Sequence, residues 1–154
     1  MATTYKTAQV ANSTPAIGGH GIVNPTARLH AVSGSISTWV INDTVQMGYL
    51  PKNAVVVGCG LKASAQLDSS GSATLTFDVG IVGTLQLFKA AVSTVGRAAG
   101  VSADTTIAAG GYLYKTTADT LIVVTAHAAA ATPGAGTLEL ELSYFVEDTA
   151  GSVA

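Results

Sequence analysis

One stretch of the sequence constrains the fold more than any other, the segment 73–83, ATLTFDVGIVG. Every second position in it is apolar, with polar or small residues between: Leu75, Phe77, Val79 and Ile81. Because successive side chains of a β-strand point to opposite faces, this alternation predicts a strand with one apolar face. A helix needs apolar spacings of three and four, and the Thr, Phe, Val and Ile content also favours an extended backbone.

Other short segments resemble it, and Gly, Pro, Asn and Asp residues separate them. We expect further strands over 29–33, 35–42, 44–50, 54–63, 105–115, 119–128 and 137–147. Gly58 and Gly60 interrupt one of these strands and indicate a bulge or a close backbone approach. The last strand alternates leucines with Glu139, Glu141 and Ser143.

One segment has a different period. Leu85, Phe88, Ala91, Val92 and Val95 approximate a helical face, so we expect a short helix near 86–95 that ends at Gly96. About eight strands with at most one short helix predict an all-β fold, a two-sheet sandwich or a barrel.

The chain divides into three parts. Residues 1–26 contain Thr, Ser, Asn, Gly and two prolines without periodicity, so we expect an extended N-terminal arm that cannot fold alone. The arm would lie on the domain, lie on a neighbour or remain mobile. Residues 27–147 form the β-domain, and 148–154 are a polar C-terminal tail.

The charge composition argues against nucleic-acid binding. Charged residues make up only 10% of the chain, with seven basic and nine acidic residues. Nucleic-acid binding needs clustered Lys and Arg, which are absent. So few charges indicate either a surface covered by other subunits or a Thr/Ser-rich soluble domain.

The N-terminus lacks the apolar run of a signal peptide, and the longest weakly polar run, 121–131, is about half a membrane span. We therefore expect a protein made in the cytoplasm, without membrane contact. Cys59 is the only cysteine and lies in an apolar run, which predicts a small buried thiol.

No catalytic or metal-binding constellation stands out. The histidines His20, His30 and His127 lack metal-ligand spacing, and no G-x-S-x-G elbow is present, so we expect no catalytic residue, metal or cofactor. Asp78 interrupts the polar face of the central strand, where we expect it to pair with Arg97 or Lys115, or with backbone N–H groups.

Two further candidates have simpler interpretations. Glu139, Glu141 and Glu147 share one face of the last strand. Alternate strand positions lie about 6.5–7 Å apart, too far for calcium ligands, so an acidic strip facing solvent or a partner is preferred. Trp39 and Tyr49 could form a sugar-stacking platform, but a Trp beside Val40 and Ile41 more often belongs to the core.

The order of segments resembles that of the head decoration, or cement, proteins of tailed bacteriophages. The resemblance covers about residues 45–147 and is carried by LPKNAVVVGCGLKAS (50–64), SATLTFDVGIVGTLQLF (72–88) and AGGYLYKTTADTLIVVTAHAAAATPGAGTLELELSYFVE (109–147). It implies a jelly-roll-like sandwich that sits on the outer capsid surface of the virion as a dimer or trimer. It also implies a partner, the major capsid protein, whose neighbouring subunits such proteins clamp.

That function needs no catalytic residues, only a stiff scaffold and a gripping surface. We expect the arm and the loops at one end of the sandwich to form the capsid contacts, with these arm residues as candidates: Gln9, Asn12, Pro15, Ile17, His20, Ile22 and Pro25. The alternative is a carbohydrate-binding jelly-roll module of a phage or bacterial adhesin. A third interpretation, a cupin-type enzyme, lacks the required histidine cluster.

Overall fold

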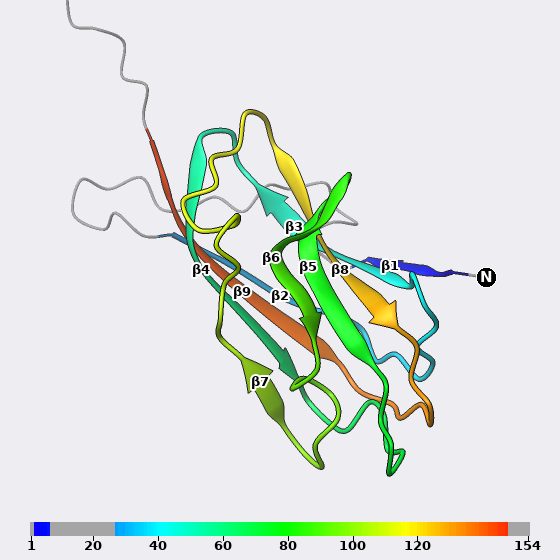
Figure 1. Ribbon diagram of the computed structural model, residues 1–154. Helices are drawn as coiled ribbons and strands as arrows, with labels where there is room; N and C mark the ends of the chain where they lie inside the picture. The colour runs from blue at the N-terminus through cyan, green and yellow to red at the C-terminus, as the bar shows by residue number, and fades with distance from the viewer. Residues whose placement is uncertain (1, 7–26, 148–154) are drawn as a thin grey trace, which may run out of the picture.

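The computed structural model describes residues 2–6 and 27–147 of the chain. Within these ranges the chain forms nine strands and no helix, so the all-β prediction is confirmed. The strands are β1 (Thr4–Lys6), β2 (Ala27–Val32), β3 (Thr44–Leu50), β4 (Ala54–Ala63), β5 (Thr76–Ile81), β6 (Thr84–Val92), β7 (Ser102–Asp104), β8 (Thr120–Ala128) and β9 (Leu138–Val146) (Figure 1).

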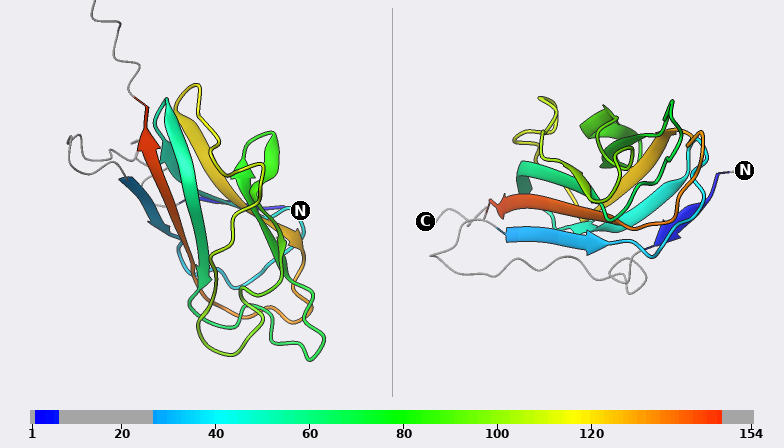
Figure 2. Two further views of the ribbon diagram at one scale, coloured as in Figure 1. Left: turned by 60° about the vertical axis from the view of Figure 1, so that its left-hand side comes forward. Right: turned by 90° about the horizontal axis from the view of Figure 1, so that it is seen from below.

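The strands form two sheets that pack face to face, a β-sandwich (Figure 2). One sheet has five strands in the order β1-β3-β8-β5-β6, and the other has four in the order β2-β9-β4-β7. All neighbouring pairs are antiparallel except β1 and β3, which pair in parallel with Tyr5 opposite Val45. The predicted two-sheet sandwich is confirmed.

The core lies between the sheets and follows the predicted alternation. On β9 the even-numbered residues from Leu138 to Tyr144 are fully buried, while the odd-numbered residues are partly exposed. On β5, Phe77 and Val79 are fully buried in the core, but Asp78 and Gly80 between them are buried as well, so burial does not alternate on this strand. The Trp39 ring packs edge-on against Phe77 with centroids 5.0 Å apart, a favourable aromatic geometry.

The helix expected near 86–95 is wrong, because β6 occupies most of that segment. The pairing of β6 with β5 shifts twice, between the pairs Ile81–Thr84 and Val79–Lys89 and again before Phe77–Val92. Each extra residue in an irregular strand changes which face the following side chains occupy. The apolar residues of β6 are therefore spaced unevenly and imitate a helical period.

Two expected strands differ from the structure. Over 105–115 only Lys115 makes an isolated bridge, to Val55, and a short strand, β7, precedes the segment instead. Over 35–42 only Ile36 bridges, to Gly136. Both segments contain a residue with a left-handed backbone, Leu113 at φ 61° and Asn42 at φ 69°, which is incompatible with a continuous strand.

The N-terminal arm contributes a short strand to the domain. Thr3 N–H donates to the Asp43 carboxylate at 2.6 Å, and Thr44 N–H donates to the Thr3 carbonyl at 2.8 Å. These contacts hold β1 against the edge of the five-stranded sheet. The seven arm residues named as capsid-contact candidates lie outside the described residues, so their role stays a prediction.

Candidate interaction surface

The outer face of the four-stranded sheet carries a network of charged side chains. Glu139 on β9 accepts from Lys62 Nζ at 2.8 Å with one oxygen and lies 3.0 Å from His30 Nε2 with the other. Glu141 pairs with Arg28 at 3.0 Å. The hydrogen bonds from Lys62 and His30 hold the pKa of the Glu139 carboxyl below its usual value. The predicted acidic strip is therefore a mixed-charge strip, which we call the charged strip.

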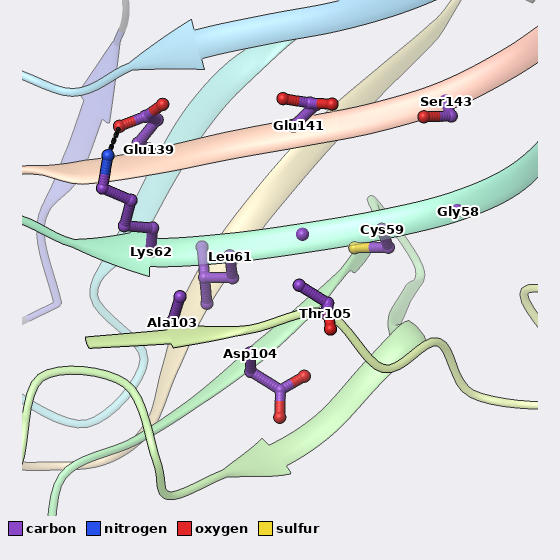
Figure 3. A pocket seen from close by; sticks show the side chains of 11 residues that line it. Gly58, Cys59, Leu61, Lys62, Ala103, Asp104, Thr105, Glu139, Glu141 and Ser143 are labelled. Atoms are coloured by element: carbon purple, nitrogen blue, oxygen red, sulfur yellow. Dashed lines mark hydrogen bonds and ion pairs between the residues drawn. The ribbon is translucent and has the colours of Figure 1, made fainter.

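Beside the charged strip lies a hollow of about 330 Å³ between β9, the middle of β4 and the end of β7 (Figure 3). Its floor is the backbone at Gly58 and Gly60, and its sides carry polar groups of Glu141, Ser143 and Thr105. Figure 3 shows Glu141 and Ser143 along β9, and Thr105 across β4 from β9. The hollow exists because two residues of β4 have no side chain.

The two glycines of β4 have different local settings. The β4–β9 register shifts between Val56 and Gly58, so the predicted bulge is confirmed there. A Cβ added at Gly58 would meet Ser143 at 3.6 Å, and one added at Gly60 would meet the Glu141 carbonyl at 3.8 Å. Both are ordinary contacts, and neither glycine has a positive φ. Packing within the chain therefore leaves room for a larger residue at either position.

Cys59 lies between these glycines, and its side chain is buried under the sheet. Burial raises the pKa of the Cys59 thiol to about 12, although nearby Lys89 acts in the opposite direction. Because the thiolate is the reactive form, this thiol is inert at neutral pH. The predicted small buried cysteine is confirmed.

Lys89, which sequence reasoning missed, is buried beside the hollow. Its Nζ lies 2.5 Å from Asp104 Oδ1 and also donates to the Thr106 carbonyl. The pair joins β6 of one sheet to β7 of the other. The sequence did not indicate that Lys89 is buried, because a lysine in an apparent helix is normally exposed to solvent.

Asp68 organises the loops at one end of the sandwich. Its fully buried carboxylate accepts backbone N–H bonds from both loops that meet there, from Ser70, Thr74, Leu75, Ala131 and Thr132. Burial alone would raise the pKa of Asp68, but the hydrogen bonds from these N–H groups outweigh it and lower the pKa well below the ordinary value. No pattern in the sequence links Asp68 to the loop around residue 130, because the two are more than sixty residues apart.

Asp78 lies in a polar cluster on the five-stranded sheet. Its Oδ1 accepts the Ala91 N–H at 2.6 Å, and its Oδ2 lies 2.8 Å from His127 Nδ1 and 3.2 Å from Gln86 Nε2. Of the partners expected for Asp78, backbone N–H groups are the ones found. Arg97 instead donates to the carbonyls of Leu75 and Thr74, and Lys115 pairs with Glu147.

The remaining candidates do not assemble into a site. His30 and His127 belong to different sheets, His20 lies outside the described residues, and no group of three metal-ligating side chains occurs among the residues that are described. The Trp39 side chain is 1% exposed, so its ring offers no platform for a sugar. In the part of the chain that the structure describes, no helix could cross a membrane.

Sequence comparison matches this chain to no protein-family model and to no curated protein. Comparison of structures does find neighbours. A chain in the capsid of Ralstonia phage GP4 is 25% identical, with a TM-score of 0.74 over 96% of this chain and 100% of that one.

A chain in the capsid asymmetric unit of cyanophage Pam1 is 24% identical, with a TM-score of 0.69 over 89% of this chain and 96% of that one. Both alignments span nearly the whole of each chain. The chain thus shares its fold with chains of bacteriophage capsids, and the resemblance to capsid-associated phage proteins that the sequence indicated is confirmed.

Proposed function

We propose that this chain is a structural protein of a phage virion that decorates the outside of the capsid and cements neighbouring major capsid subunits. The observation that carries the proposal is the match over 96% of the chain to a chain in the capsid of Ralstonia phage GP4. A structural role without catalysis fits both capsid neighbours.

The physical character of the domain supports the same role. Eight of the fifteen charged side chains among the described residues form ion pairs: Arg28–Glu141 and Lys62–Glu139 on the charged strip, Lys115–Glu147 elsewhere on the surface, and the buried pair Lys89–Asp104. Paired charges lower the cost of bringing a second surface close, because each carries its counter-charge into the contact. A subunit that grips two capsomers at once gains further from high effective concentration.

The proposal includes an outer-surface location, synthesis in the host bacterial cytoplasm and a dimeric or trimeric state. It assigns the capsid contacts to the arm, residues 9–26, and to loops at one end of the sandwich. Short apolar and proline residues in that arm can lie extended along a neighbouring subunit at little entropic cost.

The test uses heads of the phage that encodes this chain, prepared without the protein. Purified protein added back should cosediment with the heads in a fixed ratio to the major capsid protein and should raise the temperature at which the heads release their DNA. Binding only to the assembled state stabilises that state by mass action. Cosedimentation at background level, with heads equally fragile, would contradict the proposal.

A pair of truncations tests the role of the arm. Removing residues 1–24 should weaken attachment at least tenfold, whereas removing only residues 2–6 deletes β1 and controls for loss of the strand itself. Equal occupancy by the wild type and the longer truncation would assign the contacts to the folded domain instead.

A further inference from the structure

We propose that the hollow over Gly58 and Gly60 receives an arginine or lysine side chain from a neighbouring capsid subunit. This inference rests on the proposed function and deepens it, because it names the chemistry of one contact. The hollow lies next to the charged strip, on the outer face of the four-stranded sheet (Figure 3).

Two glycines, Gly58 and Gly60, lie in the interior of β4 beneath the hollow. Glycine in the interior of a strand weakens it, and it often marks a close approach by another molecule. Gly58 directly follows the bulge, where an added Cβ would lie 3.6 Å from Ser143. At Gly60 neither the backbone angle nor any internal contact requires glycine, since an added Cβ would lie 3.8 Å from its nearest neighbour. Glycine at position 60 keeps the hollow on the outer face of the sheet open.

The polar groups around the hollow have free hydrogen-bond acceptors. Glu141 uses only Oε1 in its pair with Arg28, and Ser143 and Thr105 make no side-chain hydrogen bond to any described residue. These three side chains therefore offer a carboxylate oxygen and two hydroxyl oxygens as acceptors. A guanidinium or ammonium group has only donors and matches that set.

The charged side chains that line the hollow are mainly acidic. The lining contains three carboxylates, those of Asp104, Glu139 and Glu141, and one cation, Lys62. Asp104 is neutralised by buried Lys89, and Glu139 by Lys62. Glu141 is paired with Arg28, and this pair is the most exposed of the three, with side chains 69% and 44% exposed. Such surface pairs are weak, so an incoming cation can replace or join Arg28.

The experiment compares the binding of Gly60→Val and Gly110→Val to phage heads that were prepared without this protein. The control position is exposed, and an added Cβ there would meet nothing within 4 Å. Valine favours strands, so Gly60→Val should melt within a few degrees of the wild type while filling the hollow. We expect Gly60→Val to bind heads at least tenfold more weakly and Gly110→Val to bind like the wild type.

A charge variant tests the chemistry of the occupant. Glu141→Gln keeps the shape and removes the charge, so it should weaken binding about tenfold at low salt and less at high salt. Glu141→Lys should bind still more weakly, since it would repel the incoming cation.

The outcomes separate this inference from the proposed function. If the wild type does not bind heads, the proposed function fails. If the wild type and Gly60→Val bind equally, the hollow is not a contact and this inference is overturned, while the capsid role stands. If Gly60→Val instead alters the sedimentation of the free protein, a second copy fills the hollow, and the assignment to a capsid subunit is wrong.

Discussion

Lys89 and Asp104 form a buried ion pair that joins the two sheets of the sandwich at one edge. Lys89 lies on β6 of the five-stranded sheet and Asp104 on β7 of the four-stranded sheet, with Nζ and Oδ1 2.5 Å apart. The side chains are 1% and 16% exposed. Burial alone would raise the pKa of Asp104, but the hydrogen bonds from Lys89 and Thr106 lower it. A three-residue strand with little apolar surface is thus held to the domain by charge.

Asp104→Asn should destabilise the protein by about 3–5 kcal/mol, because it leaves a buried ammonium without a counter-charge. Lys89→Met leaves the Asp104 carboxylate unpaired, but that side chain is 16% exposed and keeps the N–H and hydroxyl of Thr106, so this variant should cost less. Guanidinium unfolding of the wild type and both variants measures the difference. An Asp104→Asn variant as stable as the wild type would mean that packing, not the ion pair, holds β7.

Asp68→Asn should cost about 3 kcal/mol, since an amide keeps one acceptor oxygen and turns donors toward N–H groups that are themselves donors. The control is Asp119→Asn, because Asp119 accepts only the exposed Lys52 N–H at 3.0 Å. That variant should lose less than about 1 kcal/mol. Chemical denaturation followed by tryptophan fluorescence suits the comparison, since Trp39 is buried in the core. A wild-type midpoint in Asp68→Asn would show that the loops hold together without the carboxylate.

Acid should unfold the protein through the same carboxylates. The pKa values of Asp68 and Asp104 are lowered in the folded protein relative to the ordinary value of 3.8. Their stabilisation is therefore fully present above pH 3.8 and is lost as the pH falls through the folded pKa values. Below that pH the free energy of unfolding should fall by up to about 1.4 kcal/mol per pH unit for each carboxylate. In Asp68→Asn the free energy of unfolding should depend less steeply on pH, by the uptake of about one proton. Denaturant unfolding measured between pH 2 and 6 would reveal the difference.

Gly80→Ala should be strongly destabilising. A Cβ at this position of β5 would lie 2.2 Å from the Thr84 carbonyl oxygen and 2.5 Å from that of Leu85, so the backbone of the β5–β6 hairpin would have to move. We expect a loss of at least about 3 kcal/mol. Gly71→Ala, where a Cβ meets nothing within 4 Å, should stay within about 1 kcal/mol of the wild type. Similar thermal midpoints for the two variants would contradict the tight packing of this hairpin.

The strands with regular alternation were predictable from the sequence. The bounds of β3 and β4 agree with the expected 44–50 and 54–63, and β8 and β9 agree within one residue at each end. In these strands the intrinsic β-propensity of the residues and their burial in the core require the same period-two spacing of apolar residues. The strands can therefore be predicted without knowledge of the tertiary structure.

The irregular elements were not predictable. In β6, Phe88 and Lys89 are both buried although they are adjacent, because the pairing with β5 shifts on either side of them. A bulge depends on the partner strand, and a sequence read one segment at a time contains no partner. The same limit applies to Asp68, whose carboxylate bonds N–H groups of Ala131 and Thr132, more than sixty residues away.

The candidate surface was visible only in part. The sequence showed the alternating glutamates of the last strand and the glycines at 58 and 60, and it indicated a bulge or close approach. It could not place them together, because β4 and β9 are far apart in the chain and meet only by pairing, with Gly60 opposite Glu141.

The sequence by itself determined that the chain is all-β, because the period-two pattern of apolar residues is a local property of each strand. It also determined that Cys59 is buried, since it lies in an apolar strand. Only the tertiary structure decided which strands pair, where their registers shift, that Lys89 and Asp104 bridge the sheets and where a hollow opens. Those features arise from contacts between residues distant in sequence, and their energies depend on burial and geometry that the assembled sandwich creates.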